Sequence, residues 1–173
     1  MVLLKSESIP MGTDAPNFSL EGTDGKIYSL RNFMDAKVLV IVFMCNHCPY
    51  VQTIWPNLIE LSRDFADNGV QFVGINPNTI NPEYEEESME MMQRYFNEQG
   101  MNFPYLEDKK QSVAREYGAS CTPDIFVYDA GRKLAYHGRI DNNELADAID
   151  ALLVDGQPDD EQNPSQGCSI KWV

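Results

Sequence analysis

Hydrophobic positions along the chain follow two alternating patterns. Continuous apolar and β-branched runs cover residues 37–44 and 70–75, which is typical of strands buried on both faces. Between these runs, apolar residues recur at helical spacing and predict a helix that ends at Asn68-Gly69. The apolar stripe of that helix consists of Val51, Ile54, Trp55, Leu58, Leu61 and Phe65. A strand, a helix and a second strand in this order predict an α/β fold.

The same alternation continues on both sides of this unit. Residues 17–33 indicate two short strands around the turn signal Thr23-Asp24-Gly25. The other predicted elements are a helix over 83–98, an edge-like strand over 103–106, a helix over 110–117 ended by Gly118, strands over 124–128 and 133–139 joined by Asp129-Ala130-Gly131, and a last helix around 145–152.

Length and charge narrow the class of protein. The 173 residues contain no repeat or linker, so we expect a single domain over 1–173. A net charge of −14 argues against nucleic acid or an anionic membrane as a partner. No apolar stretch approaches the roughly 20 residues of a membrane helix. The N-terminal residues lack the apolar run of a signal peptide, so we expect a cytoplasmic protein, or a periplasmic one if a leader has been removed.

The candidate chemistry lies between the first buried strand and the helix that follows it. The segment Cys45-Asn46-His47-Cys48 is a C-x-x-C motif, whose two sulfurs can meet once the second cysteine enters the helix. The unpaired N–H groups and dipole of a helix N-terminus stabilise a thiolate, and the thiolate is the species that attacks a disulfide. Structural zinc is the alternative, but it usually takes four ligands in two pairs. We therefore expect redox chemistry without a metal or a cofactor.

Three motifs in order give the chain a resemblance to a known family. Residues 15–20, with Asp24-Gly25-Lys26, resemble the start of the redoxin branch of thioredoxin-fold proteins, which holds the TlpA/ResA-like oxidoreductases and the AhpC/TSA peroxiredoxins. The chain is most similar to a bacterial subgroup marked by CNHCPY, CTPD and PSxGCxIKW, found here at 45–50, 121–124 and 164–172. The resemblance implies a thioredoxin-like α/β fold, with a central mixed sheet flanked by helices and an extra N-terminal hairpin.

The resemblance also implies roles for individual residues. Cys45 would be the exposed nucleophile, and Cys48 the buried thiol that resolves the mixed disulfide. Pro123 would be a cis-proline facing the active pair, and backbone groups beside the Thr122-Pro123 bond would pair with an extended substrate segment. A partly protonated His47 would stabilise the Cys45 thiolate and make the disulfide more oxidising; the alternative is an exposed residue without a role.

Two further cysteines lie outside the C-x-x-C motif. Cys121 lies two residues before Pro123 and is expected near the active pair, unless it is simply a small buried apolar residue. Cys168 lies in the polar tail, residues 156–173. It is either inert or carried back by the tail towards Cys121 or the active site. Because the tail ends in an apolar Ile and Trp, we expect it to pack on the domain and to hold Cys168 near another thiol, with Cys121 as the first choice.

These observations predict a thiol-disulfide oxidoreductase. Its partners would be protein or small-molecule disulfides and thiols, together with an unidentified redox partner protein. A peroxiredoxin-type thiol peroxidase is one alternative, although Val42, Phe43 and Met44 stand where that family has its Pro and Thr. A Sco-like copper or zinc carrier using Cys45, Cys48 and a His is another. Thioredoxins keep a buried acid on the strand before this motif to accept a proton from the second cysteine. The strand over 37–44 has no acid, so proton transfer must use another group or water.

Overall fold

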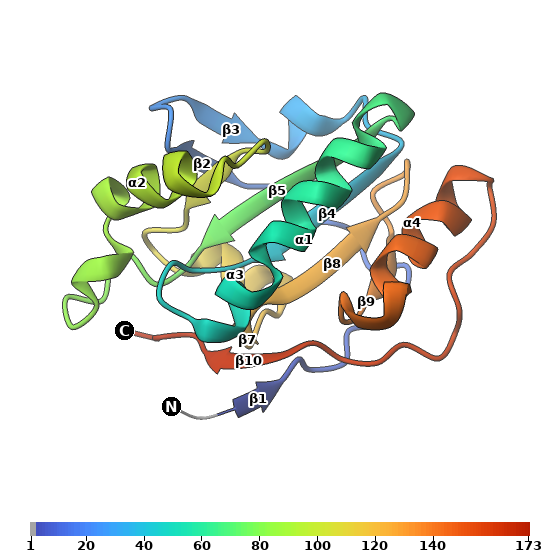
Figure 1. The fold of residues 1–173 in the computed structure, drawn as a ribbon. Coiled ribbons are helices and arrows are strands. Elements are labelled where there is room, and N and C mark those ends of the chain that lie inside the picture. The colour runs from blue at the N-terminus through green and yellow to red at the C-terminus, as the bar shows by residue number, and fades with distance from the viewer. Residues whose placement is uncertain (1–2) are drawn as a thin grey trace.

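The computed structural model describes residues 3–173 (Figure 1). The strands are β1 (Leu3–Lys5), β2 (Ser19–Gly22), β3 (Ile27–Ser29), β4 (Val38–Phe43), β5 (Val70–Asn76), β6 (Tyr105–Glu107), β7 (Cys121–Thr122), β8 (Asp124–Tyr128), β9 (Leu134–His137) and β10 (Gln166–Ser169). The helices are α1 (Pro49–Phe65), α2 (Met89–Gln99), α3 (Ser112–Tyr117) and α4 (Glu144–Leu153). Seven strands form a sheet in the order β3-β2-β6-β5-β4-β8-β9, and three form a second sheet in the order β1-β10-β7.

Strand β4 lies inside the large sheet, next to its middle strand β5, and all of its residues are buried. It pairs parallel with β5 and antiparallel with β8. Because side chains alternate along a strand, Val40 joins a core that contains Trp55 of α1 and Leu145 of α4. Its neighbour Ile41 faces the opposite core. Figure 1 shows α1 and α4 crossing the front of this sheet. This arrangement confirms the expected thioredoxin-like α/β fold with a mixed sheet flanked by helices.

The expected N-terminal hairpin is present, but its connection was not foreseen. Strand β2 pairs with β3 and also with β6, with Glu21 opposite Glu107. Strand β6 therefore lies between β2 and β5, and the expectation of an edge-like strand there is wrong. The sequence pattern could not show this, because an edge becomes internal only when a distant hairpin covers it.

The helix expected over 83–98 begins later, at Met89. The hydroxyl oxygen of Ser88 caps it by accepting the backbone N–H of Met91 at 3.3 Å. The acidic residues before it form a separate 3₁₀ turn, Glu85–Glu87. The acids expected in the first turns of the helix therefore lie outside it, and the side chain of one of them, Glu87, is buried.

The C-terminal residues form the middle strand of the small sheet. Strand β10 pairs antiparallel with β1 on one side and with β7 on the other, placing Cys168 opposite both Leu3 and Thr122. Beyond it, Ile170 is buried, and the Trp172 ring, 40% exposed, carries the guanidinium of Arg115 at 4.2 Å. Within the described residues, no helix has the length and apolar character needed to cross a membrane.

Candidate active site

The C-x-x-C pair lies at the junction of β4 and α1. Cys45 follows the end of β4 closely, and Cys48 is the N-cap of α1, with extended backbone angles. Pro49 takes the first helical position, where its missing N–H costs no hydrogen bond. All four cysteines of the chain are thiols in this structure, and all are buried. The exposed nucleophile expected at Cys45 is thus absent from this conformation, because the residue has no accessible surface.

The loop that contains Pro123 faces this pair. The Thr122-Pro123 peptide bond is cis, which is the isomer that the sequence resemblance implies. The Cys45 sulfur lies 3.4 Å from the Thr122 hydroxyl, and the Cys48 thiol donates to the Thr122 carbonyl oxygen at 3.3 Å. Strand β10 pairs with this same Thr122. The backbone edge at which the resemblance expects a substrate segment is therefore occupied by the protein's own C-terminal strand.

Cys168 lies beside Cys48 and not, as expected, beside Cys121. The sulfur atoms of Cys48 and Cys168 are 2.6 Å apart. In the register of β10 and β7, Cys168 is opposite Thr122, whereas Ser169 is opposite Cys121. Paired residues share one face of a sheet and successive residues alternate, so the side chains of Cys121 and Cys168 leave on opposite faces. The Cys121 thiol instead donates to the Pro123 carbonyl at 3.6 Å.

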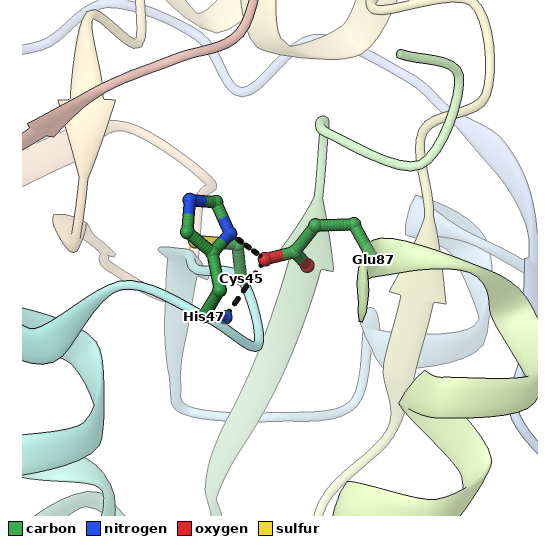
Figure 2. Close-up of side chains that lie close together, drawn as sticks. All are labelled: Cys45, His47 and Glu87. Atoms are coloured by element: carbon green, nitrogen blue, oxygen red, sulfur yellow. Dashed lines mark hydrogen bonds and ion pairs between the residues drawn. The ribbon is translucent and has the colours of Figure 1, made fainter. Parts of the chain in front are cut away.

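A buried carboxylate, Glu87, holds the other side of the C-x-x-C loop. It accepts the backbone N–H groups of Asn46 and His47, each at 2.8 Å, and the side-chain amide of Asn76 at 2.8 Å. It also pairs with Nδ1 of His47. Figure 2 shows the imidazole and the carboxylate facing each other, with Cys45 beside the imidazole. Glu87 has no accessible surface, so an acid does reach this site, although not from β4.

Sequence reasoning missed Glu87 because it is one of three consecutive acids. Glu85 and Glu86 are exposed while Glu87 is buried, and no feature of the three-residue run separates them. The only clue was the absence of an acid in the strand before the motif, which left another group or water as the proton acceptor. Asn46 was missed for a similar reason: its side chain accepts the Tyr105 hydroxyl at 2.8 Å and donates to the Glu86 carbonyl at 2.8 Å.

The surroundings shift the acidities of these groups in different directions. The hydrogen bond with Glu87 raises the pKa of His47, and the nearby charges of Glu87 and Glu86 act in the same direction. Burial raises the pKa of Cys45, and the hydrogen bond with Cys48 and the charge of Glu87 act in the same direction. The hydrogen bond with Cys45 lowers the pKa of Cys48, aided by Cys168 and the backbone N–H of Val51. These shifts favour a thiolate on Cys48 over one on Cys45.

Three side chains of the site could also bind a metal ion. Ligand atoms of Cys45, His47 and Glu87 all lie within 4.8 Å of one another. Sulfur, nitrogen and oxygen donors together suit zinc or copper. In the present arrangement the carboxylate of Glu87 already accepts hydrogen bonds from two backbone N–H groups, an amide and the imidazole. A metal ion would have to replace the bond to the imidazole.

A surface hollow of about 390 Å³ lies next to the cis-proline loop. Its lining includes Pro123, Tyr50 at the start of α1, and residues 164–166 of the tail. Tyr50 is 42% exposed. The hollow is therefore a concave surface bounded by the cis-proline loop, the start of α1 and the tail.

The fold and the site together define a thioredoxin-fold protein with a dithiol at the start of its first long helix. The sequence profile of the AhpC/TSA family matches residues 11–137, and the chain belongs to that family. A relative from Bacillus subtilis, the thiol-disulfide oxidoreductase ResA, is 29% identical over 133 residues, which are 77% of this chain and 69% of ResA.

Solved structures agree with this assignment. An uncharacterized conserved protein from Geobacillus kaustophilus superposes with a TM-score of 0.97 at 38% identity, covering 100% of this chain and 97% of that one. The thioredoxin domain of a thiol-disulfide oxidoreductase from Bacteroides vulgatus superposes with a TM-score of 0.71 at 18% identity, covering 84% of this chain and 99% of that one. The second likeness concerns the fold alone.

Proposed function

We propose that the protein is a thiol-disulfide oxidoreductase whose active pair is Cys45 and Cys48. The observation that carries the proposal is the packing of both thiols against Thr122, beside the cis bond to Pro123. Relatives named as thiol-disulfide oxidoreductases support an enzymatic redox role. The substrates would be disulfides of proteins or small molecules, with a separate redox protein or thiol pool restoring the starting state.

The reaction begins with a thiolate on the active pair. In the closed structure burial is the main cause of the raised Cys45 pKa. When the site opens to water this cause weakens, so the pKa of Cys45 falls and a thiolate can form on its sulfur. The Cys45 thiolate then attacks a substrate disulfide, forming a mixed disulfide and releasing one substrate thiol. Cys48 attacks the Cys45 sulfur, which releases the second substrate thiol and leaves a Cys45–Cys48 disulfide.

The His47–Glu87 pair supplies the acid–base group that β4 lacks. A carboxylate oxygen of Glu87 and a ring nitrogen of His47 both lie within 4.8 Å of the Cys45 sulfur. The imidazole is 17% exposed, so it connects the buried carboxylate with solvent. A proton leaving the thiol pair can pass to this couple and on to water.

Single-turnover kinetics with the two active-site variants test the proposal. Cys45→Ser should abolish reduction of a model protein disulfide such as insulin, and Cys48→Ser should accumulate a mixed disulfide on Cys45. Cys121→Ser is the matched control, because its sulfur lies on the opposite face of β7. Full reductase activity in Cys45→Ser would show that the roles are wrong. A reaction much faster with hydrogen peroxide than with insulin would favour the thiol peroxidase instead.

The group formed by Cys45, His47 and Glu87 favours one other function, a copper or zinc carrier. Metal analysis of freshly purified protein tests it. A carrier should contain close to one equivalent of metal, which Glu87→Ala and His47→Ala should both lose. Protein purified without metal, and unable to take up zinc or Cu(I) in a titration, would leave the redox function alone.

A further inference from the structure

We propose that Cys168 is a third redox-active cysteine, which takes over the disulfide from the active pair by forming a Cys48–Cys168 bond. The proposal rests on the proposed function, because it adds a step after the Cys45–Cys48 disulfide has formed. It assigns a chemical role to the C-terminal strand and not only a structural one.

The geometry places the two sulfurs almost at bonding distance. The Cys48 and Cys168 sulfur atoms are 2.6 Å apart, whereas a disulfide bond measures about 2.05 Å. A movement of about half an ångström therefore joins them. Secondary structure fixes the backbone position of both residues, since Cys48 is the N-cap of α1 and Cys168 lies within β10.

The tail is held in place on both sides of Cys168. Before it, the Ser165 hydroxyl donates to the Gly138 carbonyl at 3.0 Å, and the Ser165 carbonyl accepts the N–H of Ser6 at 2.9 Å. After it, the backbone N–H of Lys171 donates to the Asn78 side chain at 2.9 Å. These bonds hold the segment on both sides of Cys168, and the pairing of β10 with β7 sets it against the cis-proline loop. The sulfur contact therefore follows from the fold.

Gly167 shows how closely the strand approaches this loop. A Cβ atom at this position would lie 1.9 Å from the carbonyl oxygen of Thr122 and 2.9 Å from the nitrogen of Pro123. Only glycine permits that approach. The absence of a side chain at Gly167 thus lets β10 contact the backbone that faces Cys45 and Cys48.

Oxidation of the active pair makes Cys168 a better nucleophile. In the reduced protein burial raises the pKa of Cys168, and the hydrogen bond and charge of Cys48 raise it further, while Lys171 acts in the opposite direction. Once Cys48 is part of a disulfide it has no negative charge, so only burial continues to oppose the Cys168 thiolate. Lys171 still favours it.

The step is an exchange within one molecule. The Cys168 thiolate attacks the Cys48 sulfur, the Cys48–Cys168 bond forms, and the Cys45–Cys48 bond breaks. Cys45 leaves as a thiolate and takes up the proton that Cys168 gave away. One disulfide is present before and after, so no further oxidant or reductant takes part. The product holds the tail covalently to α1 and returns Cys45 to the thiol state.

Peptide mapping of the oxidised full-length chain tests this step. Trypsin releases Cys45 and Cys48 together in residues 38–63, Cys121 in 116–132 and Cys168 in 140–171. A Cys45–Cys48 bond stays inside the first peptide, whereas a Cys48–Cys168 bond joins the first to the third. Protein oxidised with glutathione disulfide, quenched in acid and alkylated should contain the joined peptides.

The Cys45→Ser variant isolates the new pair. Oxidised glutathione should convert it to a form with peptides 38–63 and 140–171 joined, and Cys45→Ser/Cys168→Ser should stop at a glutathione adduct on Cys48. Cys121→Ser should give the wild-type map. Folded Cys45→Ser that carries only the glutathione adduct, or oxidised wild type without the joined peptides, would overturn the proposal. Failure of wild type to reduce insulin would instead overturn the proposed function, so the two outcomes are separable.

Discussion

At the scale of single residues, the site depends on Glu87 as much as on its cysteines. The carboxylate accepts two backbone N–H groups of the C-x-x-C loop and pairs with His47, and the residue has no accessible surface. A buried charge is tolerated only when hydrogen bonds replace its hydration, and here those bonds also set the shape of the loop. Spacing reveals Cys45 and Cys48 in the sequence, but which of three adjacent acids turns inward is decided only by tertiary structure.

Replacing Glu87 by glutamine should change both acidity and stability. The charge of Glu87 helps to raise the pKa of Cys45, so Glu87→Gln should lower that pKa. The new amide would direct its own N–H groups at existing donors, which should reduce the free energy of unfolding by about 1–3 kcal/mol. Thiolate absorbance against pH and urea unfolding measure the two effects. Glu85→Gln, an exposed residue on the same turn, is the control. An unchanged Cys45 pKa would contradict this account.

The His47–Glu87 pair should also make stability depend on pH. Its hydrogen bond raises the pKa of His47 in the folded protein; Glu86 acts in the same direction, while burial and Lys171 oppose it. The stabilisation is therefore complete below the unfolded pKa of about 6.5 and is lost as pH rises through the higher folded value. His47→Gln should flatten the fall in unfolding free energy above about pH 6.5. The same slope in both proteins would show that His47 does not contribute.

At the scale of elements, periodicity predicts what a segment forms but not what it pairs with. The buried runs became β4 and β5, and the apolar stripe became α1. Strands β7 and β10 are too short to show a pattern, with two and four residues, and their pairing depends on where the chain returns. For this reason the sequence predicted that the tail packs on the domain, but it predicted Cys121 as the neighbour of Cys168. The register of β10 on β7 instead places Cys168 beside Cys48.

Gly167→Ala should release the tail strand from the cis-proline loop. The added Cβ would lie 1.9 Å from the Thr122 carbonyl oxygen, so β10 and β7 could not keep their register. Each 1.4 kcal/mol lost from docking raises the open population about tenfold. Alkylation of Cys48 by iodoacetamide, followed by peptide mapping, measures that population. Gly131→Ala is the control, because its Cβ would meet only the Asp129 carboxylate at 3.4 Å. Equal alkylation rates in the two variants would show that β10 does not cover the site.

At the scale of the whole molecule, the protein is closed around its own reactive groups. Cys45 and Cys48 have no accessible surface, and the C-terminal strand β10 lies against Cys48 and pairs with Thr122. An enzyme that exchanges disulfides must therefore open before it reacts. We expect β10 to be the element that moves, since it occupies the β7 edge at Thr122, whose hydroxyl and carbonyl contact the two sulfurs.

If the site must open before the thiols react, the kinetics should show a limit that does not depend on the substrate. The rate of oxidation of the reduced protein should rise with disulfide concentration and then level off, because opening becomes limiting. Glutathione disulfide and insulin should reach the same limiting rate, despite their different sizes. Gly167→Ala should raise that limit, whereas Gly131→Ala should leave it unchanged. Stopped-flow measurements over a wide concentration range decide the matter: a rate that stays proportional to glutathione disulfide would mean that small disulfides reach Cys45 without movement of the tail.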